Sequence, residues 1–555
     1  MSSKVFGIDL GTTYSCIAHV DQYGVPTVVL NSEGQPTTPS VVMFNQGGTV
    51  SVGGVAKAQA GMFEDRVAQL VKPHMGDAEW QFTVDGEAYT APAVASKVLE
   101  AVVEDARLQT GEDIQDVVIT VPAYFGQAER EATRAAGEIA HLNVVDIINE
   151  PTAAAFAYGF GVGEGQDQTV LVYDLGGGTF DITVIRVEPG RIRVIATEGD
   201  HELGGNLWDE QVAALLSEKF QAENPDADDP LLDPNEAGDL RLKAEEAKRH
   251  LSTLPATRVK VQSGAHLGMI EITREDFDNA TSSLLERTID LTRRVLEQAR
   301  ELDAGEIDRI LLVGGSSLMP QVSERLTAEF GYELQLADPH MAVAKGAALW
   351  GQKQGITVEI AEELRKRGVE VNGSGSLADV DEAVLDEVLS EVAPRAGLTK
   401  DAMQKIVETE ATNVCSQGFG VVVVDGDTRE EFVDFLIHRN TPLPASHTET
   451  YETLHDDAIS LIVDVREQAT QDESKLVDNN TTVVAGEIEG LPRGYPAGTP
   501  VDVTFAMDNA GRLTVTARHP GNREPLVLEH NAASAVGAEQ VEAMREQMSK
   551  LSRAR

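Results

Sequence analysis

Two apolar stretches of the sequence each end in an aspartate that is followed by a tight, glycine-rich turn. They are "VFGIDLGTTY" (5–14) and "VLVYDLGGGTFDIT" (170–183). The acids are Asp9 and Asp174. The turn residues are Gly11, Thr12, Thr13 and Tyr14 after Asp9, and Gly176, Gly177, Gly178 and Thr179 after Asp174. Because the same design occurs twice in one chain, we expect both copies to serve one site.

The chemistry of these turns favours a polyphosphate bound together with a metal ion. Glycines let backbone N–H groups approach an anion closely, and threonine hydroxyls add further donors. Carboxylates repel phosphate, so the two acids fit only if a cation lies between, and hydrated Mg²⁺ is the natural candidate. The chain has no complete G-x-x-x-x-G-K-[ST] loop and no complete G-x-G-x-x-G fingerprint, so the predicted nucleotide site is of another kind.

Composition and charge exclude several classes of protein. With 555 residues, of which 42% are hydrophobic, the chain can hold about two to four domains. A formal charge of −46 disfavours nucleic acid as a partner. Two cysteines, Cys16 and Cys415, cannot form a disulfide framework and favour a reducing compartment. No leader pattern and no apolar stretch of ~20 residues is present, so we expect a soluble, cytoplasmic protein without membrane contact.

Strand and helix patterns alternate over residues 1–355, which is typical of α/β architecture. "DVVITVPAYF" (116–125) and "EIDRILLVGGSS" (306–317) each place an apolar strand before a turn. "QAEREATRAAGEIAHL" (127–142) and "SSLLERTIDLTRRVLEQAREL" (282–302) carry apolar residues at three- and four-residue spacing, which predicts helices. Since the strand–acid–glycine design is repeated, we expect two similar lobes that face each other across a cleft.

The rest of the chain divides into three parts. Residues 356–413 predict three short helices without convergent chemical groups. Residues 414–535 show short alternating runs between turns, typical of an all-β module, with a hairpin around 508–511. Residues 536–555 predict a single helix. Its apolar face would be formed by Val541, Met544, Met548 and Leu551.

Five further stretches carry a resemblance to a known family. They are "ITVPAYFGQAEREATRAAG" (119–137), "IINEPTAAAFAYGFG" (147–161), "LGGNLWD" (203–209), "VGGSSLMP" (313–320) and "LIHRNTPLPASHTETYET" (436–453). With the glycine turns, they make the chain resemble the 70-kDa heat-shock (DnaK-type) chaperones of the actin-like ATPase superfamily. The expected fold is therefore an α/β actin-like ATPase domain with duplicated, ribonuclease-H-like lobes, then a helical insert and a β-sandwich peptide-binding domain.

The resemblance implies roles for individual residues. Asp9 and Asp174 would anchor Mg²⁺ through water. Lys72 matches the family's catalytic lysine, and Glu150 matches its acid that positions water or metal. The implied catalytic set is Asp9, Lys72, Glu150, Asp174 and Thr179. The residues implied to hold ATP or ADP are Gly11, Thr12, Thr13, Tyr14, Gly176, Gly177, Gly178, Gly204, Gly205, Glu245, Lys248, Arg249, Ser252, Gly314, Gly315 and Ser316.

Coupling sites and partners are implied in the same way. Pro122 and Arg130 match family positions that relay the nucleotide state. The candidates for peptide contact in the β-module are Phe419, Val421, Val422 and Leu454. The expected partners are extended or unfolded peptide segments, together with J-domain and nucleotide-exchange co-chaperones, in protein folding and the stress response.

The chain also departs from the family pattern. Leu318 stands where the family usually has an arginine that stacks on adenine, and His340 replaces a common acid. The family's leucine-rich linker is missing after Gly355, and the long helical lid is reduced to the helix of 536–555. We favour an ATP-dependent chaperone. Two alternatives stay open, namely a nucleotide-dependent scaffold protein whose inserted helices engage a dedicated partner, and a small-molecule kinase.

Overall fold

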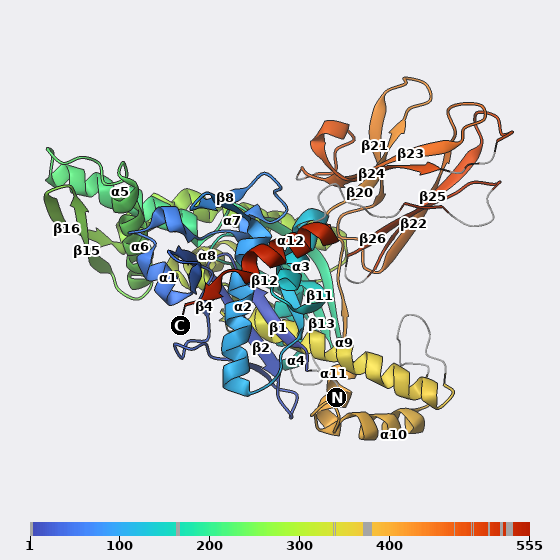
Figure 1. Cartoon of the computed structure of the whole chain (residues 1–555), viewed down its shortest axis with the longest axis horizontal. Coiled ribbons are helices and arrows are strands. Elements are labelled where there is room, and N and C mark those ends of the chain that lie inside the picture. Colours follow the sequence, from blue (N-terminus) through green and yellow to red (C-terminus); the bar gives the residue numbers. More distant parts are fainter. Residues whose placement is uncertain are drawn as a thin grey trace.

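The computed structural model describes residues 4–161, 167–336, 338, 340–369, 380–470, 472–489, 491, 493–508, 511–521, 526–528 and 537–554. We name residues 4–161 lobe I, residues 167–336 lobe II and residues 414–528 the β-module. In Figure 1 the two lobes form the main body, the β-module projects at the upper right, and a small helical unit around α10 projects at the lower right.

Each lobe is built around a mixed sheet, and the two sheets have equivalent strand orders. The order is β11-β10-β1-β2-β3 in lobe I and β18-β17-β12-β13-β14 in lobe II. In each sheet the first strand pairs antiparallel with its successor and parallel with a strand that follows a long helix. Asp9 and Asp174 are both the penultimate residue of that first strand. The duplication expected from the sequence is therefore present in the topology.

The strands of the lobe I sheet are β1 (Phe6–Leu10), β2 (Tyr14–Val20), β3 (Pro26–Val28), β4 (Thr38–Pro39), β10 (Asp116–Val121) and β11 (Asn143–Asn149). Those of the lobe II sheet are β12 (Gln168–Leu175), β13 (Phe180–Glu188), β14 (Arg191–Asp200), β17 (Arg309–Val313) and β18 (Glu333–Leu336). A sixth strand, β19 (Glu410–Thr412), reaches the lobe II sheet from outside the lobe and pairs with β14.

Two helices, α4 (Glu150–Gly161) and α9 (Ala342–Lys366), connect the lobes. α9 packs on β1 and β2, α4 packs on β13 and β14, and the two helices pack on each other. The crossing is close, because a Cβ atom on Gly346 would lie 1.7 Å from the carbonyl oxygen of Ala153. Apolar residues from both sheets join one core around the two helices. This crossing fixes the place where the lobes face each other.

Smaller elements extend each lobe. Lobe I carries α1 (Gly54–Gln59), α2 (Ala91–Thr110), α3 (Gln127–Ile139), β5 (Val42–Asn45), β6 (Thr49–Val52), β7 (Val67–Ala68), β8 (Gln81–Val84) and β9 (Glu87–Thr90). Lobe II carries α5 (Gly205–Glu223), α6 (Pro234–Leu251), β15 (Ala256–Ser263), β16 (His266–Thr273), α7 (Arg274–Glu301) and α8 (Pro320–Phe330). The helices predicted from 127–142 and 282–302 are confirmed as α3 and α7.

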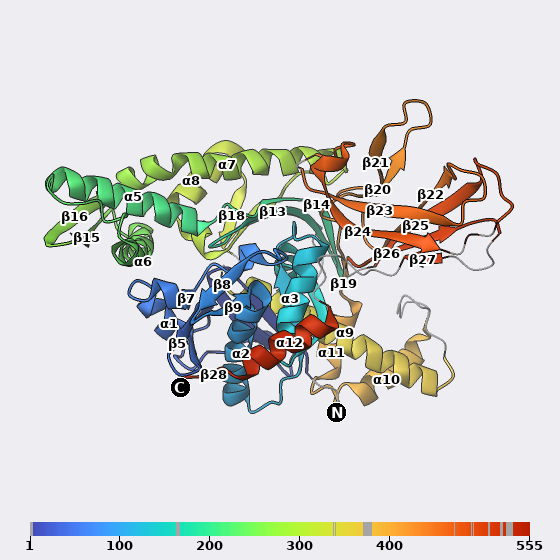
Figure 2. The same cartoon turned by 45° about the horizontal axis from the view of Figure 1, so that its top comes forward.

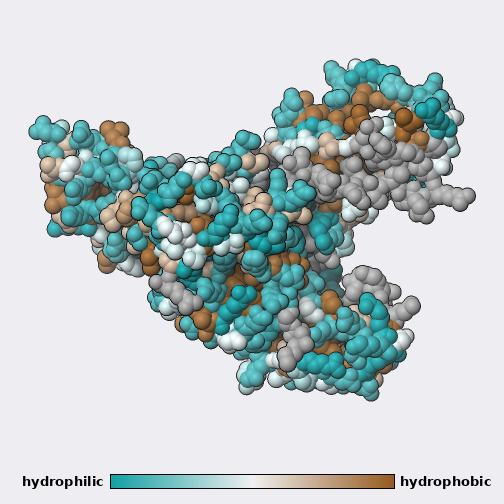
Figure 3. All heavy atoms as spheres, viewed as in Figure 1, coloured by the Kyte–Doolittle hydropathy of each residue, from teal (hydrophilic) through white to brown (hydrophobic). Residues whose placement is uncertain are grey.

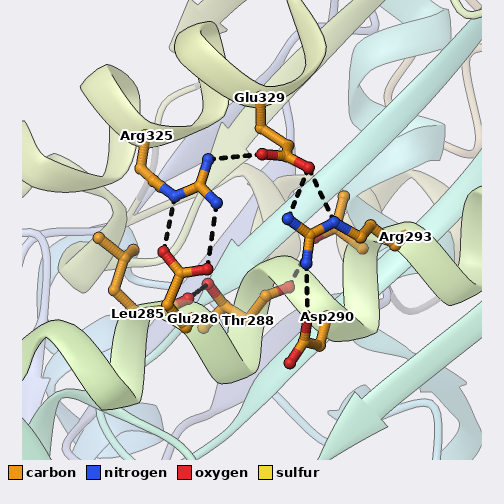
Figure 4. Close-up of polar contacts among 8 residues, drawn as sticks. Leu285, Glu286, Thr288, Asp290, Arg293, Arg325 and Glu329 are labelled. Atoms are coloured by element: carbon orange, nitrogen blue, oxygen red, sulfur yellow. Dashed lines mark hydrogen bonds and ion pairs between the residues drawn. The ribbon is translucent and has the colours of Figure 1, made fainter.

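Ion pairs attach α8 to α7 on the surface of lobe II (Figure 4). The Arg325 guanidinium binds both carboxylate oxygens of Glu286, at 2.6 and 3.1 Å. Glu329 accepts hydrogen bonds from Arg325 at 2.7 Å and from Arg293 at 2.5 Å. Since these charges are exposed and form a shared network, they fix the orientation of α8 more than they stabilise the fold.

The domain boundary expected at 355 needs correction. α9 runs without a break from Ala342 to Lys366, so position 355 falls inside a helix. The helix continues because its buried face continues, through Ile356, Ile360 and Leu364. The other two predicted helices form as α10 (Glu382–Val392) and α11 (Lys400–Glu408), and both pack back on α9.

The β-module consists of two four-stranded antiparallel sheets, ordered β21-β20-β23-β24 and β22-β25-β26-β27. Apolar residues of both sheets meet in one core, in which Val465 and Phe505 are completely buried. The predicted hairpin is present as β25–β26, although Asn509 of its turn lies outside the described residues. The strands are β20 (Phe419–Val424), β21 (Glu431–Ile437), β22 (Ala445–Glu452), β23 (Ser460–Gln468), β24 (Asn480–Glu489), β25 (Pro500–Met507), β26 (Leu513–Arg518) and β27 (Leu526–Leu528).

The C-terminal helix forms where the sequence predicts it, but in an unexpected place. α12 (Ala538–Ser549) packs on α2 and α3 of lobe I rather than on the β-module (Figure 2). Val541 and Met548 of its predicted apolar face are buried in the lobe I core, and Met544 and Leu551 pack against that core. β28 (Ser552–Arg553) then pairs with β6. In this structure the helix is therefore not a lid over the β-module.

The visible surface agrees with the acidic composition. Figure 3 shows a mostly hydrophilic face, with hydrophobic residues scattered over the lobes, the β-module and the helical unit. Within the described ranges, no helix combines the length and the apolar character that crossing a membrane requires.

Candidate functional site

The glycine turns of the two lobes are in contact with each other. A Cβ atom on Gly177 would lie 2.2 Å from the Thr13 hydroxyl oxygen, and one on Gly178 would lie 2.5 Å from the Thr12 methyl group. A Cβ atom on Gly204 would lie 2.4 Å from the carbonyl carbon of Gly178. Any side chain at these glycines would push the turns apart. The two copies of the motif therefore form one continuous surface of backbone and hydroxyl groups.

The joined turns line a cleft of about 850 Å³ between the lobes. This volume is in the range of small-molecule and cofactor sites. Every residue expected to be catalytic or to hold nucleotide lines the cleft, except Gly178 and Gly204. Those two glycines lie behind the second turn, where they allow the close packing described above.

Acids and one lysine gather in the cleft beside the turns. Lys72 forms an ion pair with Glu150, and the two side chains are only 6% and 10% exposed. Burial, and then the charge of Glu150, raise the pKa of Asp9 to about 7. Burial also raises the pKa of Asp174, with further contributions from the charges of Glu150 and Asp181. Ionised together, the acids would carry more negative charge than Lys72 can balance, and each therefore opposes the ionisation of the others.

A hydrated divalent cation fits this excess of negative charge. Asp9 and Asp174 offer carboxylate oxygens, the ligands that Mg²⁺ prefers. Thr120 orients one of them by donating a hydrogen bond from its hydroxyl to Asp9 Oδ1 at 3.1 Å. In the part of the chain that the structure describes, no three acids, histidines or cysteines lie close enough to hold a metal together. The two carboxylates suit Mg²⁺ that keeps several waters and shares its charge with a bound phosphate.

A second polar group bridges the lobes at one side of the cleft, and we name it the cleft latch. It consists of Tyr14 and Lys57 from lobe I and Glu245 and Arg249 from α6 of lobe II. Lys57 Nζ lies 2.6 Å from Glu245 and donates to the Tyr14 hydroxyl at 2.8 Å. Arg249 donates to the same hydroxyl at 2.6 Å and pairs with Glu245 at 2.9 Å. The lobes cannot separate at this side without breaking these contacts.

We expect Lys57→Ala to release bound nucleotide about fivefold faster than wild type. The substitution removes the lysine from a partly exposed ion pair, a loss of ~1 kcal/mol in the closed state. Stopped-flow release of a fluorescent ADP analogue measures the rate. Lys219→Ala is the matched control, because it removes a lysine that pairs with Asp276 at 2.7 Å outside the cleft. An unchanged release rate in Lys57→Ala would show that the latch does not hold the cleft closed.

The sequence also matches the model of a known protein family. A family model described as Hsp70 protein matches residues 5–359 and 404–554, which together make up most of the 555-residue chain. This chain belongs to the Hsp70 family. Members of this family are ATPases that act as ATP-dependent chaperones. α10 falls between the two matched segments.

One end of the cleft differs from the pattern that the sequence resemblance implies for an Hsp70 protein. Gly314, Gly315 and Ser316 line this end, as expected for an adenine pocket. Leu318, which is 40% exposed, replaces the usual arginine there. His340 packs against Gly315, where a Cβ atom would lie 2.7 Å from its ring, and burial lowers the pKa of His340. The base would therefore meet an apolar leucine and the imidazole ring of His340.

We expect Leu318→Arg to tighten ADP binding by about fivefold. A guanidinium that stacks on the adenine ring adds ~1 kcal/mol of cation–π attraction. Isothermal titration calorimetry with ADP measures the change. Leu336→Arg is the control, because Leu336 is 57% exposed and does not line the cleft. Equal affinities for Leu318→Arg and wild type would mean that this leucine does not face the base.

The two residues expected to relay the nucleotide state lie between the cleft and the β-module. Pro122 precedes Ala123, whose backbone N–H donates to Asp181 beside the cleft at 3.0 Å. Arg130 lies on α3 and lines a small cavity together with Glu467 of the β-module. Pro122 is thus next to the cleft acids, and Arg130 is next to the β-module.

The β-module contacts both lobes. On lobe II, Arg439 pairs with the buried Glu198 at 3.1 Å, and Asn440 accepts a hydrogen bond from the Thr197 backbone N–H at 3.2 Å. On lobe I, Gln127 of α3 donates to a backbone carbonyl of the β25–β26 turn. A movement of one lobe relative to the other must therefore change at least one of these contacts.

The four candidates for peptide contact divide into two pairs. Phe419 and Val421 are 3% and 4% exposed and belong to the core of the β-module. Val422 is partly exposed on β20, and Leu454, which follows β22, is 51% exposed. Phe419 and Val421 are therefore core residues in this structure, since alternate residues of β20 turn toward the core.

Among the charged residues in or beside the cleft that were not predicted from the sequence are Lys57, Asp209 and Asp181. Lys57 is a lone lysine in a short helix, and nothing local distinguishes it. Asp209 pairs with Lys248 at 2.8 Å, and burial raises the pKa of Asp209 to about 6. Asp181 is buried, and its pKa is raised to about 8, mainly by burial. Asp181 lies within the stretch 170–183 and Asp209 within 203–209, so these two motifs contained the signal for both acids.

Proposed function

We propose that this chain is an ATP-dependent chaperone in which ATP hydrolysis in the cleft controls peptide binding by the β-module. In this proposal lobes I and II form an actin-like, ribonuclease-H-like ATPase domain, and the β-module is a peptide-binding β-sandwich. The strongest support is the contact between two equivalent glycine turns, one from each lobe, beside Asp9 and Asp174. Such a surface suits a polyphosphate that both lobes hold.

The cleft residues have separate tasks in this proposal. Backbone N–H groups and threonine hydroxyls of the two turns, including Thr179, hold the phosphates. Asp9 and Asp174 would hold hydrated Mg²⁺, which neutralises phosphate charge when it is bound. Glu150 orients the attacking water, and Lys72 stabilises the charge that develops on the transferred phosphoryl group.

Coupling to peptide follows from the docking of the β-module on both lobes. Nucleotide that draws the lobes together changes the distance between α3 of lobe I and Glu198 of lobe II. The β-module is attached to both, through Gln127 and Arg439. β19 also joins the segment before the β-module to the lobe II sheet. Because nucleotide and docking influence each other, peptide affinity depends on the nucleotide state.

The inserted helices support a second candidate, a nucleotide-dependent scaffold protein. α10 lies outside the segments that match the family, and it forms its own projection beside α9 (Figure 1). Its buried residues, among them Val388 and Leu389, pack into the core with α9. The exposed side of the insert is therefore the side that a dedicated partner would contact.

Peptide affinity measured with ATP and with ADP tests the main proposal. We expect weaker binding of an extended apolar peptide in ATP than in ADP, and stimulation of ATP turnover by that peptide. Equal affinities in the two nucleotides would remove the coupling. Deletion of 380–408 separates the candidates, since full protection of an unfolded client by the deleted chain counts against the scaffold function.

A further inference from the structure

The end of the chain, residues 537–554, is attached to lobe I along its whole length, and we name it the C-terminal strap. Its helix, α12, buries Val541 and Met548 in the lobe I core. Polar contacts add to this packing. Arg545 donates to the Glu138 carbonyl at 2.8 Å, and Gln547 donates to a carbonyl of the β8–β9 hairpin at 3.1 Å.

The last residues of the strap extend a sheet of lobe I. β28 adds a strand to the edge of the sheet β28-β6-β5-β7 and runs parallel to β6. The Ser552 N–H donates to the Gly48 carbonyl at 3.3 Å, and the Ala554 N–H donates to the Val50 carbonyl at 2.7 Å. Lys97 of α2 donates to the Leu551 carbonyl at 3.2 Å. The strap thus covers a strand edge that would otherwise have unpaired backbone groups.

A buried acid of α2 forms an ion pair with the arginine of the strap. Asp105 on α2 is only 4% exposed, and its carboxylate lies 2.8 Å from the Arg553 guanidinium. The other partner of this carboxylate is Ser32, whose backbone N–H and hydroxyl both donate to it at 3.1 Å. Arg553 also donates to the Ala101 carbonyl at 3.2 Å. Burying a carboxylate without a cation is costly, so the site that β6 and α2 form is suited to an arginine on an extended segment.

The strap is connected to the cleft latch through a few residues. β6, which the strap pairs with, leads into Gly53, whose φ of 86° allows the turn into α1. The Lys57 N–H donates to the Gly53 carbonyl at 3.0 Å, and Lys57 belongs to the latch. A strand that is held in place by β28 therefore sets the position of the helix that carries the latch lysine.

We propose that β6 and α2 together form a docking site for an extended, arginine-bearing segment, that the strap occupies it, and that this occupancy holds the cleft latch closed. The inference about the latch rests on the proposed nucleotide site. Undocking of residues 551–554 exposes the edge of β6 and lets α1 shift, so Lys57 loses its fixed place beside Glu245. Bound nucleotide then leaves faster.

Arg553→Ala in the full chain is the test, with hydrogen exchange and release of a fluorescent ADP analogue as separate readouts. We expect the amides of 49–52 to exchange about tenfold faster and nucleotide to leave about threefold faster. Asp105→Asn should give the same result with the strap sequence intact. Arg258→Ala is the control, because that arginine pairs with Glu271 on an exposed hairpin of lobe II. It should match wild type in both readouts.

The double variant Lys57→Ala/Arg553→Ala separates action through the latch from a general loosening. If the strap acts through Lys57, the double variant releases nucleotide no faster than Lys57→Ala alone. If the effects of the two substitutions on the release rate multiply in the double variant, the link to the latch is overturned. It is also overturned if Arg553→Ala releases nucleotide at the wild-type rate although the amides of 49–52 exchange faster. Unchanged exchange at 49–52 would overturn the docking site. Hydrogen exchange can be measured without nucleotide. If the wild-type protein binds no ADP, the proposed function is contradicted, but hydrogen exchange at 49–52 still tests the docking site.

Discussion

Replacing Lys72 with alanine is expected to lower ATP turnover by about 10²- to 10³-fold, while ATP binding stays within about tenfold of wild type. Lys72 is the cation that faces the acids at the end of the cleft, where it pairs with Glu150. Without it, the charge that develops on the transferred phosphoryl group loses the lysine cation that stabilises it. Binding depends mainly on the glycine turns and the latch, which the substitution does not touch.

Single-turnover hydrolysis and calorimetric titration with ATP separate the two effects. Because removing one partner of a buried ion pair also destabilises the fold, thermal unfolding of the variant is measured alongside. Lys219→Ala serves again as the control, as its ion pair lies outside the cleft. Turnover within threefold of wild type in a folded Lys72→Ala protein would show that Lys72 takes no part in the chemistry.

Raising the pH from 6 to 8 is expected to loosen the docking of the β-module by up to about 100-fold. Glu467 on β23 is buried against Gly126 at the start of α3, where a Cβ atom would lie 2.5 Å from its carboxylate. Burial raises the pKa of Glu467 to about 8 and the charge of Glu129 contributes, whereas Arg130 acts in the opposite direction. The docked state therefore holds Glu467 protonated at neutral pH.

The sign of the pH effect follows from the raised pKa. When the β-module undocks, Glu467 meets water and returns toward its ordinary pKa of 4.5. Docking is then strongest below about pH 4.5, and the equilibrium constant for docking falls by up to tenfold per pH unit until about pH 8, where the docked carboxyl also ionises.

Fluorescence transfer between dyes on Ser282→Cys and Thr428→Cys follows the docking, because both native cysteines are buried. Glu467→Gln should remove the pH dependence, whereas Glu452→Gln on the exposed side of β22 should retain it. A transfer efficiency that does not change between pH 6 and 8 in wild type would contradict this role of Glu467.

Local sequence patterns were sufficient to predict those parts of the candidate site that consist of a single strand and the turn that follows it. Asp9 and Asp174 were placed correctly relative to their turns because each belongs to the same strand as the glycines that follow. The contact between the two turns depends on the crossing of α4 and α9, for which Gly346 is essential. No local pattern marks that glycine, so the shared cleft was expected from the duplication of the motif and from the family resemblance, not from the residues that create the crossing.

The features that the sequence patterns did not predict depend on contacts between residues that are far apart in the chain. Lys57 joins the latch only because α1 and α6 meet across the cleft. The alternation of β20 predicts a strand but not which face is buried, so Phe419 and Val421 could not be assigned to the core. Similarly, the apolar face of α12 was visible in the sequence, whereas its partner, lobe I, was decided by the position of α2 and α3.

The most direct test of the account is a crystal structure of the full chain with Mg²⁺ and a non-hydrolysable ATP analogue. We predict that the triphosphate lies between the turn at Gly11–Thr13 and the turn at Gly176–Thr179, with Mg²⁺ one water away from Asp9 and Asp174. A triphosphate bound by one lobe alone, or an empty cleft at millimolar nucleotide, would contradict it.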